Sequence, residues 1–225
     1  MQVVVLISGS GSNLQALIDG ATADLPICIR AVVSNEPGAF GLERARRVGI
    51  ETRVLNHRDY QSREAYDAAL GDLIDAFEPS LIVLAGFMRI LTPAFVARFR
   101  GRMLNIHPSL LPKFRGLHTH RRVLEAGETV HGASVHFVTE ALDSGPVVLQ
   151  ARVHVEPGDD AEKLAARVLS REHRIYPQTV HWFAQGRLRL DAAGRPRLDG
   201  WVLTHPLQLD ELTADPLTSL GGVLN

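Results

Sequence analysis

The chain has 225 residues, of which 45% are hydrophobic and 22% charged, and its formal net charge is −1. This composition is typical of a globular protein with enough residues for one large α/β domain or two small ones. A charge so close to zero excludes long-range attraction to nucleic acid or to an anionic membrane. We therefore expect small-molecule substrates, with no nucleic-acid partner and no membrane partner.

The chain contains one cysteine, Cys28, which lies in the strand-like run "PICIRAVV" and is expected to be buried. A single cysteine excludes a disulfide framework, which favours a cytoplasmic location. No segment approaches the roughly 18 apolar residues that a membrane-spanning helix needs.

Apolar runs alternate with amphipathic segments over the first hundred residues. The runs predict strands at 2–7, 27–35, 51–56, 81–87 and 103–108. Helical spacing predicts helices at 13–21, 40–49, 62–79 and 92–101. Strands that alternate with helices at short spacing indicate βαβ units and a parallel sheet.

The pattern changes after residue 112. Residues 113–127 have loop and helix features, and 130–155 resemble two strands around a turn at 143–146. A long helix is predicted over 159–186, broken near Pro177. From Arg187 on, polar turns and scattered leucines predict a loosely attached tail. The expected fold is α/β: a Rossmann-like, mostly parallel twisted sheet with helices on both faces, to which the C-terminal part adds antiparallel strands and a long helix.

The glycine loop "SGSGSN" (8–13) follows a strand and opens a helix, where backbone N–H groups and the helix dipole can hold a phosphate. Gly9 and Gly11 fill two positions of the dinucleotide motif G-x-G-x-x-G, but Leu14 occupies the third. Glu36, beside Pro37, is poorly placed to bind a ribose diol. The loop therefore favours a monophosphate site, and a tight turn without a ligand is the alternative.

The stretch "LNIHPSLLP" (104–112) places Asn105 and His107 two residues apart in an apolar run that Pro108 ends. Side chains at i and i+2 of an extended chain point to the same face, so the amide and the imidazole should emerge together. "ALDSGP" (141–146) places Asp143 before a Gly-Pro turn. If Asp143 reaches His107 through space, its carboxylate would orient the imidazole and favour the charged form; otherwise it is a turn residue.

Histidines are frequent in the middle of the chain. His118, His120, His131 and His136 join His107 within thirty residues. The spacing matches no common zinc-ligand pattern, so histidines that shape a pocket by hydrogen bonding are favoured over a metal site. The apolar segment 84–96 is mostly core, although Met88, Ile90 and Leu91 could also wall a pocket for a flat heterocycle.

Several separated motifs together resemble one enzyme family. They are "VVVLISGSGSNLQALI", "SREAYD", "LAGFMRIL", "LNIHPSLLP", "GLHTH", "HGASVHFVTEALDSGPVVLQ" and "REHRIYP". They are similar to the phosphoribosylglycinamide formyltransferases, folate-dependent enzymes of purine synthesis that formylate glycinamide ribonucleotide. The similarity runs in register over residues 1–190.

The resemblance implies a role for each matching residue. Asn105, His107 and Asp143 would be the catalytic trio. The ribonucleotide site would comprise Gly11, Ser12, Asn13, Ser170, Arg171 and Glu172. The folate site would comprise Arg63, Met88, Arg89, Ile90, Leu91, Asn105, Thr139, Glu140, Ala141, Leu142 and Asp143. The co-substrate would be 10-formyltetrahydrofolate, with no metal, in a monomer or homodimer. Arg115 and Arg171 depart from the family, which commonly has proline and glutamine there.

The resemblance also implies a domain organisation. We expect a single formyltransferase domain over 1–190, with a phosphate-binding half at 1–100 and a catalytic and folate-binding half at 101–190, followed by a tail at 191–225. Three alternatives stay open: a hydrolase of the same formyl folate, a metal-dependent hydrolase that uses the histidines, and a nucleotide-binding module without turnover.

Overall fold

The computed structural model describes residues 1–21 and 27–212, which form two compact units. The first unit comprises Met1–Asn105 with Val138–Glu140. The second comprises Ile106–Phe137 and the described residues from Ala141 on.

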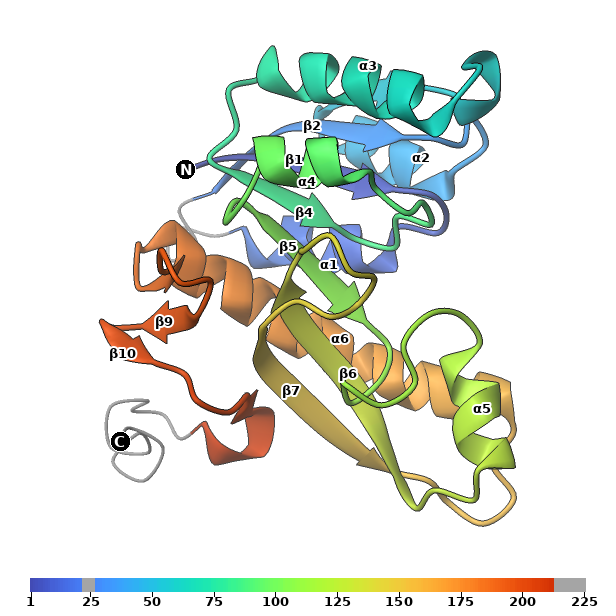
Figure 1. The fold of residues 1–225 in the computed structure, drawn as a ribbon. Coiled ribbons are helices and arrows are strands. Elements are labelled where there is room, and N and C mark those ends of the chain that lie inside the picture. Colours follow the sequence, from blue (N-terminus) through green and yellow to red (C-terminus); the bar gives the residue numbers. More distant parts are fainter. Residues whose placement is uncertain (22–26, 213–225) are drawn as a thin grey trace. The chain divides into compact units, whose positions relative to one another are not determined.

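The first unit is a parallel sheet whose strands lie in the order β5-β4-β1-β2-β3 (Figure 1). Its strands are β1 (Gln2–Ile7), β2 (Cys28–Ser34), β3 (Glu51–Val54), β4 (Leu81–Leu84) and β5 (Met103–His107), of which the last two residues belong to the second unit. Its helices are α1 (Ser12–Gly20), α2 (Phe40–Arg47), α3 (Arg63–Asp75) and α4 (Pro93–Arg98), with a short 3-10 helix η1 (His57–Asp59).

Helices cover both faces of this sheet because its central strands β1 and β4 are apolar on both sides. Val4 and Leu6 of β1 pack in a core cluster with Tyr66 and Leu70 of α3 and with Phe99 beside α4. On the other face, α2 lies so close to the side chain of Ile7 that a Cβ added at Gly41 would be 2.5 Å from it. Strands buried on both faces read as continuous apolar runs, which explains why the sequence predicts them well.

Side-chain caps set the starts of two helices. Ser62 accepts a hydrogen bond from the backbone N–H of Ala65 at α3, and Thr92 accepts one from Phe95 at α4. Each cap satisfies a first-turn N–H that has no partner within the helix. The predicted helices 62–79 and 92–101 begin at these two residues.

The second unit is built on an antiparallel hairpin with a long helix packed against it. The hairpin is β6 (Val130–Phe137) with β7 (Val147–His154), and β11 (Leu207–Gln208) pairs with β7 in parallel. The helices are α5 (Thr119–Glu125), α6 (Ala161–Ala184) and the 3-10 helix η2 (Leu209–Glu211). A small antiparallel sheet contains β8 (Leu188–Leu190), β9 (Pro196–Leu198) and β10 (Trp201–Val202). The predicted α/β class, with a mostly parallel sheet, added antiparallel strands and a long C-terminal helix, is confirmed.

Helix α6 continues through Pro177, so the predicted break is wrong. A proline inside a helix costs about 3 kcal/mol. Ile175 and Tyr176 before it, and Thr179 and Val180 after it, are fully buried. Burying each large apolar side chain contributes roughly 1.5–3 kcal/mol. Packing along the hairpin therefore outweighs the local cost of the proline.

The expectation of a loosely attached tail from Arg187 is also wrong as far as residue 212. Leu188, Leu198, Leu203 and Leu207 are buried, and both Nε and Nη2 of Arg187 donate to the carboxylate of Asp199, at 2.8 and 2.7 Å. Strands of two or three residues are too short to show a period in the sequence. The remainder of the tail, 213–225, lies outside the described residues.

Cys28 is exposed at the first position of β2, which corrects the expectation that it is buried. The burial of β2 begins only with Ala31, so the apolar run starts before the strand enters the core. Among the described residues, no helix is both long and apolar enough to cross a membrane.

Candidate active site

Strand β5 presents Asn105 and His107 from alternate positions, as the spacing predicts. His107 is 5% exposed, Asn105 is half-buried, and Ile106 between them is buried. Pro108 follows and ends the strand. The apolar neighbours hold this strand end in place, so the orientation of the two polar groups is set by the strand itself.

The imidazole of His107 has oxygen atoms at both ring nitrogens. Nδ1 lies 3.4 Å from Oδ2 of Asp143, and Nε2 lies 3.0 Å from the carbonyl oxygen of Phe114. Because a carbonyl can only accept, Nε2 carries a hydrogen in this arrangement. The contact between His107 and Asp143 that the catalytic hypothesis requires is therefore present.

Asp143 lies in a turn that aims its carboxylate inward. Its φ of 47° is left-handed, a conformation in which aspartate is enriched among non-glycine residues. Oδ2 accepts the backbone N–H of Gly116 at 2.9 Å, and Oδ1 lies 3.9 Å from Nε2 of His136. One carboxylate thus orients His107 and holds the loop at Gly116.

Of the other histidines in this part of the chain, His120 and His131 form a pair and His136 is a single buried ring, whereas His118 is exposed. Nδ1 of His120 lies 3.1 Å from Nε2 of His131. Burial, and then the neighbouring His120, lowers the pKa of His131 to about 4. Burial also lowers the pKa values of His120 and His136. Among the described residues, no group of three or more histidine, cysteine or acidic side chains is arranged to hold a metal.

The buried histidine pair predicts acid sensitivity of the fold. Because the pKa of His131 is lower in the folded chain than the ordinary value of 6.5, the unfolded chain binds more protons as pH falls from about 6.5 towards 4. We expect the free energy of unfolding to fall by about 1–2 kcal/mol from pH 7 to pH 5 through this group. Urea denaturation at both pH values measures it. His131→Gln should flatten this dependence, and an unchanged slope in the variant would contradict the assignment.

The glycine loop forms the turn between strand β1 and helix α1. Gly11 has φ 69°, which favours glycine, and caps α1 without a side-chain hydrogen bond. Ser12 and Asn13 begin the helix. An uncapped helix N-terminus on a glycine turn can bind an anion through backbone N–H groups and the helix dipole. The geometry agrees with the monophosphate reading of the loop.

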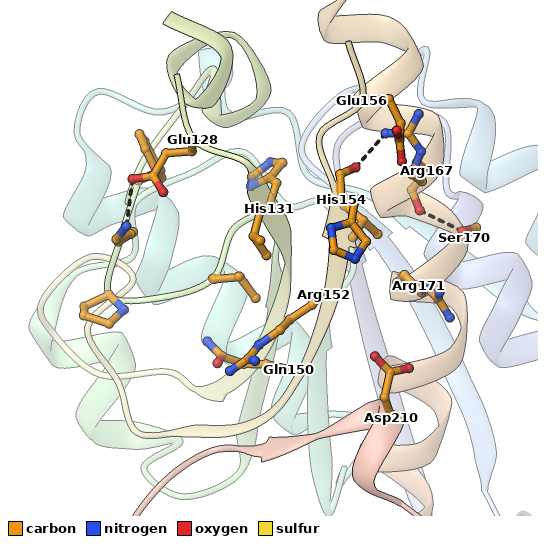
Figure 2. A pocket seen from close by; sticks show the side chains of 16 residues that line it. Glu128, His131, Gln150, Arg152, His154, Glu156, Arg167, Ser170, Arg171 and Asp210 are labelled. Atoms are coloured by element: carbon orange, nitrogen blue, oxygen red, sulfur yellow. Dashed lines mark hydrogen bonds and ion pairs between the residues drawn. The ribbon is translucent and has the colours of Figure 1, made fainter. Parts of the chain in front are cut away.

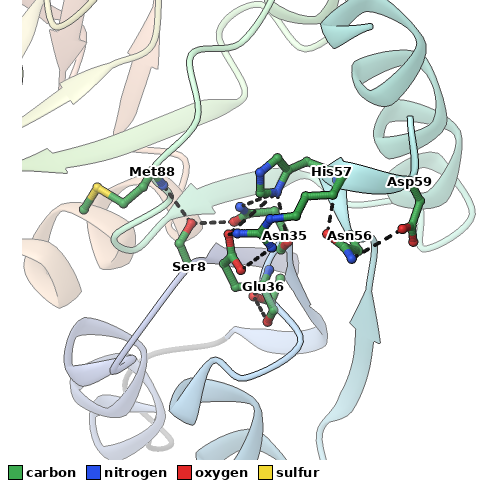
Figure 3. A network of polar contacts seen from close by, with 9 residues as sticks. Ser8, Asn35, Glu36, Asn56, His57, Asp59 and Met88 are labelled. Atoms are coloured by element: carbon green, nitrogen blue, oxygen red, sulfur yellow. Dashed lines mark hydrogen bonds and ion pairs between the residues drawn. The ribbon is translucent and has the colours of Figure 1, made fainter. Parts of the chain in front are cut away.

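A hydrogen-bonded network joins this loop to the segment 88–91 (Figure 3). The hydroxyl of Ser8 donates to Oδ1 of Asn35 at 2.5 Å and accepts the backbone N–H of Met88 at 2.8 Å. Nδ2 of Asn35 lies 3.3 Å from Nδ1 of His57. Glu36 pairs with both Nη1 and Nη2 of Arg58, which holds the pKa of Glu36 below its ordinary value.

Ser8→Ala tests this network. The variant removes the donor to Asn35 and the acceptor for Met88, and we expect it to lower the free energy of unfolding by about 1–2 kcal/mol. Thermal or urea denaturation measures the loss. Ser10→Ala is the matched control, since Ser10 is exposed in the same loop. Equal stabilities of the two variants would show that the Ser8 hydroxyl does not hold the loops together.

The residues expected at the folate site belong to both units. Arg63, the segment 88–91, Thr139 and Glu140 are in the first unit, whereas 141–143 are in the second. Met88, Ile90 and Leu142 are exposed apolar side chains, which suits contact with a ligand. Leu91 is part of the buried core, and the Arg89 guanidinium lies 4.8 Å from the ring centre of Tyr66.

Ser170 and Arg171 line a cavity of about 910 Å³ in the second unit (Figure 2). Glu172 does not line this cavity and is on the buried side of α6. The three residues expected at the ribonucleotide therefore do not share one face of the helix. Charged residues on the cavity wall are Lys113, Glu128, Arg152, Glu156, Arg167, Arg171 and Asp210. The resemblance implied a role for only one of these, Arg171, because the wall combines strand, helix and tail residues that are far apart in sequence.

The charges of this wall nearly cancel. Lys113 pairs with Glu128 at 2.7 Å, and Arg167 pairs at 2.7 Å with Asp159, whose pKa is lowered to about 2 by the arginine. The cavity therefore has no strong preference for an anion on charge alone.

Comparison with known proteins gives the family. The model of the formyl transferase family matches residues 1–180. The chain belongs to this family. The formyltransferase is 58% identical over 191 residues to the phosphoribosylglycinamide formyltransferase of Escherichia coli, covering 84% of this chain and 90% of the relative. It is 48% identical over 195 residues to the trifunctional purine biosynthetic protein adenosine-3 of Bos taurus, covering 86% of this chain and 19% of that protein.

Solved structures agree with this assignment. The structure of phosphoribosylglycinamide formyltransferase from Coxiella burnetii in complex with CHES matches this formyltransferase with a TM-score of 0.87 and 50% identity. The match covers 92% of this chain and 99% of the other. The chain is therefore an enzyme of the formyltransferase class, and its fold is that of its relatives.

Proposed function

We propose that the enzyme transfers a formyl group from 10-formyltetrahydrofolate to the glycinamide amine of glycinamide ribonucleotide in purine biosynthesis. The observation that carries the proposal is the buried contact between His107 and Asp143 at the end of β5. The 58% identity to a phosphoribosylglycinamide formyltransferase supports this substrate pair. The glycine loop supports a phosphorylated substrate.

The reaction forms one C–N bond and breaks another. The glycinamide nitrogen attacks the formyl carbon, and negative charge develops on the formyl oxygen. The bond from carbon to N10 then breaks, and the proton lost by the amine is taken up at N10. The products are the formylated ribonucleotide and tetrahydrofolate, so no metal and no covalent enzyme intermediate is required.

Three side chains have roles in this step. Asn105 donates a hydrogen bond to the oxyanion, and such a donor contributes about 10²–10³ in rate. His107 also donates to the oxyanion and helps the proton to reach N10. Asp143 holds the imidazole through Nδ1. Because Nε2 faces the carbonyl of Phe114 in this structure, donation from Nε2 requires that contact to exchange for the substrate oxygen.

The remaining assignments rest on the family resemblance. We propose that Gly11, Ser12 and Asn13 bind the phosphate and that Ser170, Arg171 and Glu172 contact the ribonucleotide. The folate would be bound by Arg63, residues 88–91, Asn105 and residues 139–143. We also propose one formyltransferase domain over 1–190 and a monomer or homodimer. A cytoplasmic location is proposed as well, because it suits a chain with a single cysteine.

A two-tube assay tests the proposed function. Purified enzyme is mixed with 10-formyltetrahydrofolate, with and without glycinamide ribonucleotide, and folate absorbance is followed. Deformylation that depends on the ribonucleotide supports the transferase. Equal deformylation without it indicates the formyltetrahydrofolate hydrolase instead. No reaction in either tube, from folded protein, would overturn the proposal and leave a nucleotide-binding module.

A further inference from the structure

Helix α2 contacts the glycine loop through Arg44. The reaction steps proposed above give this residue no role. Nε of Arg44 donates to the carbonyl oxygen of Ser10 at 2.8 Å, and Nη1 donates to Oε1 of Gln15 at 3.2 Å. The guanidinium carbon lies 4.9 Å from the ring centre of Phe40. The side chain is thus held at three points, one of them on the loop backbone.

A second contact from α2 holds the preceding loop residue. The backbone N–H of Gly41 donates to the carbonyl oxygen of Gly9 at 3.0 Å. The approach is close, because a Cβ added at Gly11 would lie 2.5 Å from the Cα of Gly41. The carbonyls of Gly9 and Ser10 are therefore both directed towards α2.

The direction of these carbonyls determines where the loop N–H groups point. In a planar trans peptide, the C=O and the N–H of the same unit point in opposite directions. With the carbonyls of Gly9 and Ser10 directed at α2, the N–H groups of Ser10 and Gly11 point away from it. An array of N–H groups on the open side of a loop is the usual cradle for a phosphate.

The charge of Arg44 is also uncompensated at short range. Within the described parts of the chain, no carboxylate forms an ion pair with Arg44, whereas its neighbour Arg47 pairs with Glu43 at 3.1 Å. A cation beside an anion site raises affinity for that anion by an amount that salt reduces.

We propose that Arg44 is a positioning residue for the phosphate of the ribonucleotide substrate. It holds the Ser10 carbonyl so that the loop N–H groups face the phosphate, and it adds a positive charge behind them. The inference rests on the proposed function, because it takes the glycine loop as the site of the substrate phosphate. It names Arg44 as a determinant of affinity for one substrate only.

Steady-state kinetics of Arg44→Ala, Arg44→Lys and Arg47→Ala test the proposal. A hydrogen bond from a charged group contributes about 1.5–3 kcal/mol, or roughly tenfold or more in affinity. We expect Arg44→Ala to raise KM for glycinamide ribonucleotide about tenfold, with kcat and the folate KM within about twofold. Arg44→Lys keeps the charge without the two-point contact and should fall between Arg44→Ala and wild type. Arg47→Ala is the matched control, since Arg47 is on the same helix and also lies over the Phe40 ring, at 5.7 Å.

Two further measurements separate positioning from general stability. The first is the ratio of kcat/KM for the ribonucleotide to that for its dephosphorylated riboside, which should fall in Arg44→Ala but not in Arg47→Ala. The second is inhibition by inorganic phosphate, which should weaken about tenfold in Arg44→Ala. Loss of thermal stability alone would change neither ratio nor inhibition selectively.

The outcomes distinguish this inference from the proposed function. Wild-type turnover with an unchanged ribonucleotide KM in Arg44→Ala would overturn the role of Arg44 and leave the proposed function standing. Equal losses for both substrates, or the same losses in Arg47→Ala, would also overturn it. A wild-type enzyme with neither ribonucleotide-dependent turnover nor inhibition by phosphate would overturn both.

Discussion

Replacing His107 with alanine is expected to lower kcat by about 10²–10⁴-fold, the range for loss of a general acid or base. The variant loses the imidazole that contacts the Asp143 carboxylate and the Phe114 carbonyl. His136 also faces Asp143, but its ring nitrogen is farther from the carboxylate, at 3.9 Å compared with 3.4 Å for His107. Steady-state kinetics with saturating substrates measure kcat, and thermal denaturation checks the fold.

His205→Ala is the control for this prediction, because His205 is an exposed histidine of the same unit. A companion variant, Asp143→Asn, keeps the shape of the side chain and removes its charge, so the turn should survive while the imidazole loses its counter-ion. We expect Asp143→Asn to lose kcat with little loss of stability. Near-full activity in His107→Ala or in Asp143→Asn would contradict the catalytic assignment.

Replacing Gly145 with alanine is expected to destabilise the second unit by several kcal/mol, on the order of 3 or more. A Cβ at this position would lie 1.7 Å from the carbonyl oxygen of Phe137 and 2.9 Å from its carbon. These atoms belong to the backbone of β6, where Phe137 also donates its N–H to the Pro146 carbonyl at 3.1 Å. Neither strand can move aside without breaking this pairing.

The expected loss includes activity, because the displaced turn carries Asp143. Urea denaturation and kcat together measure the effect of Gly145→Ala. Gly38→Ala is the control, since an added Cβ at Gly38 meets no atom within 4 Å and its φ is not left-handed. A Gly145→Ala variant with wild-type stability would show that the turn can relax, and would remove the steric explanation for this glycine.

Local patterns in the sequence are sufficient for much of the first unit. Strands buried on both faces, such as β1 and β4, need continuous apolar runs, and Ser62 and Thr92 mark helix starts through their own hydrogen bonds. The glycine loop is equally local, because the anion site proposed there would be formed by adjacent backbone N–H groups. The alternation of side chains along a strand is also a local property, so the strand alone places Asn105 and His107 on the same face.

Other features depend on contacts between residues far apart in the chain. The helix through Pro177 and the short strands after Arg187 exist because they bury side chains against the β6–β7 hairpin and against each other. The local cost of the proline is visible in the sequence, but the packing that exceeds it is not.

The site shows the same division. Histidine and aspartate are recognisable as candidate catalytic residue types, but the 3.4 Å contact between His107 and Asp143 joins residues 36 positions apart. The contact of Arg44 with Ser10 joins residues 34 positions apart. Residue type and period depend on neighbours in the chain and can be read from it directly. The pairing of distant side chains depends on the sum of the packing between them, so only the folded structure determines it.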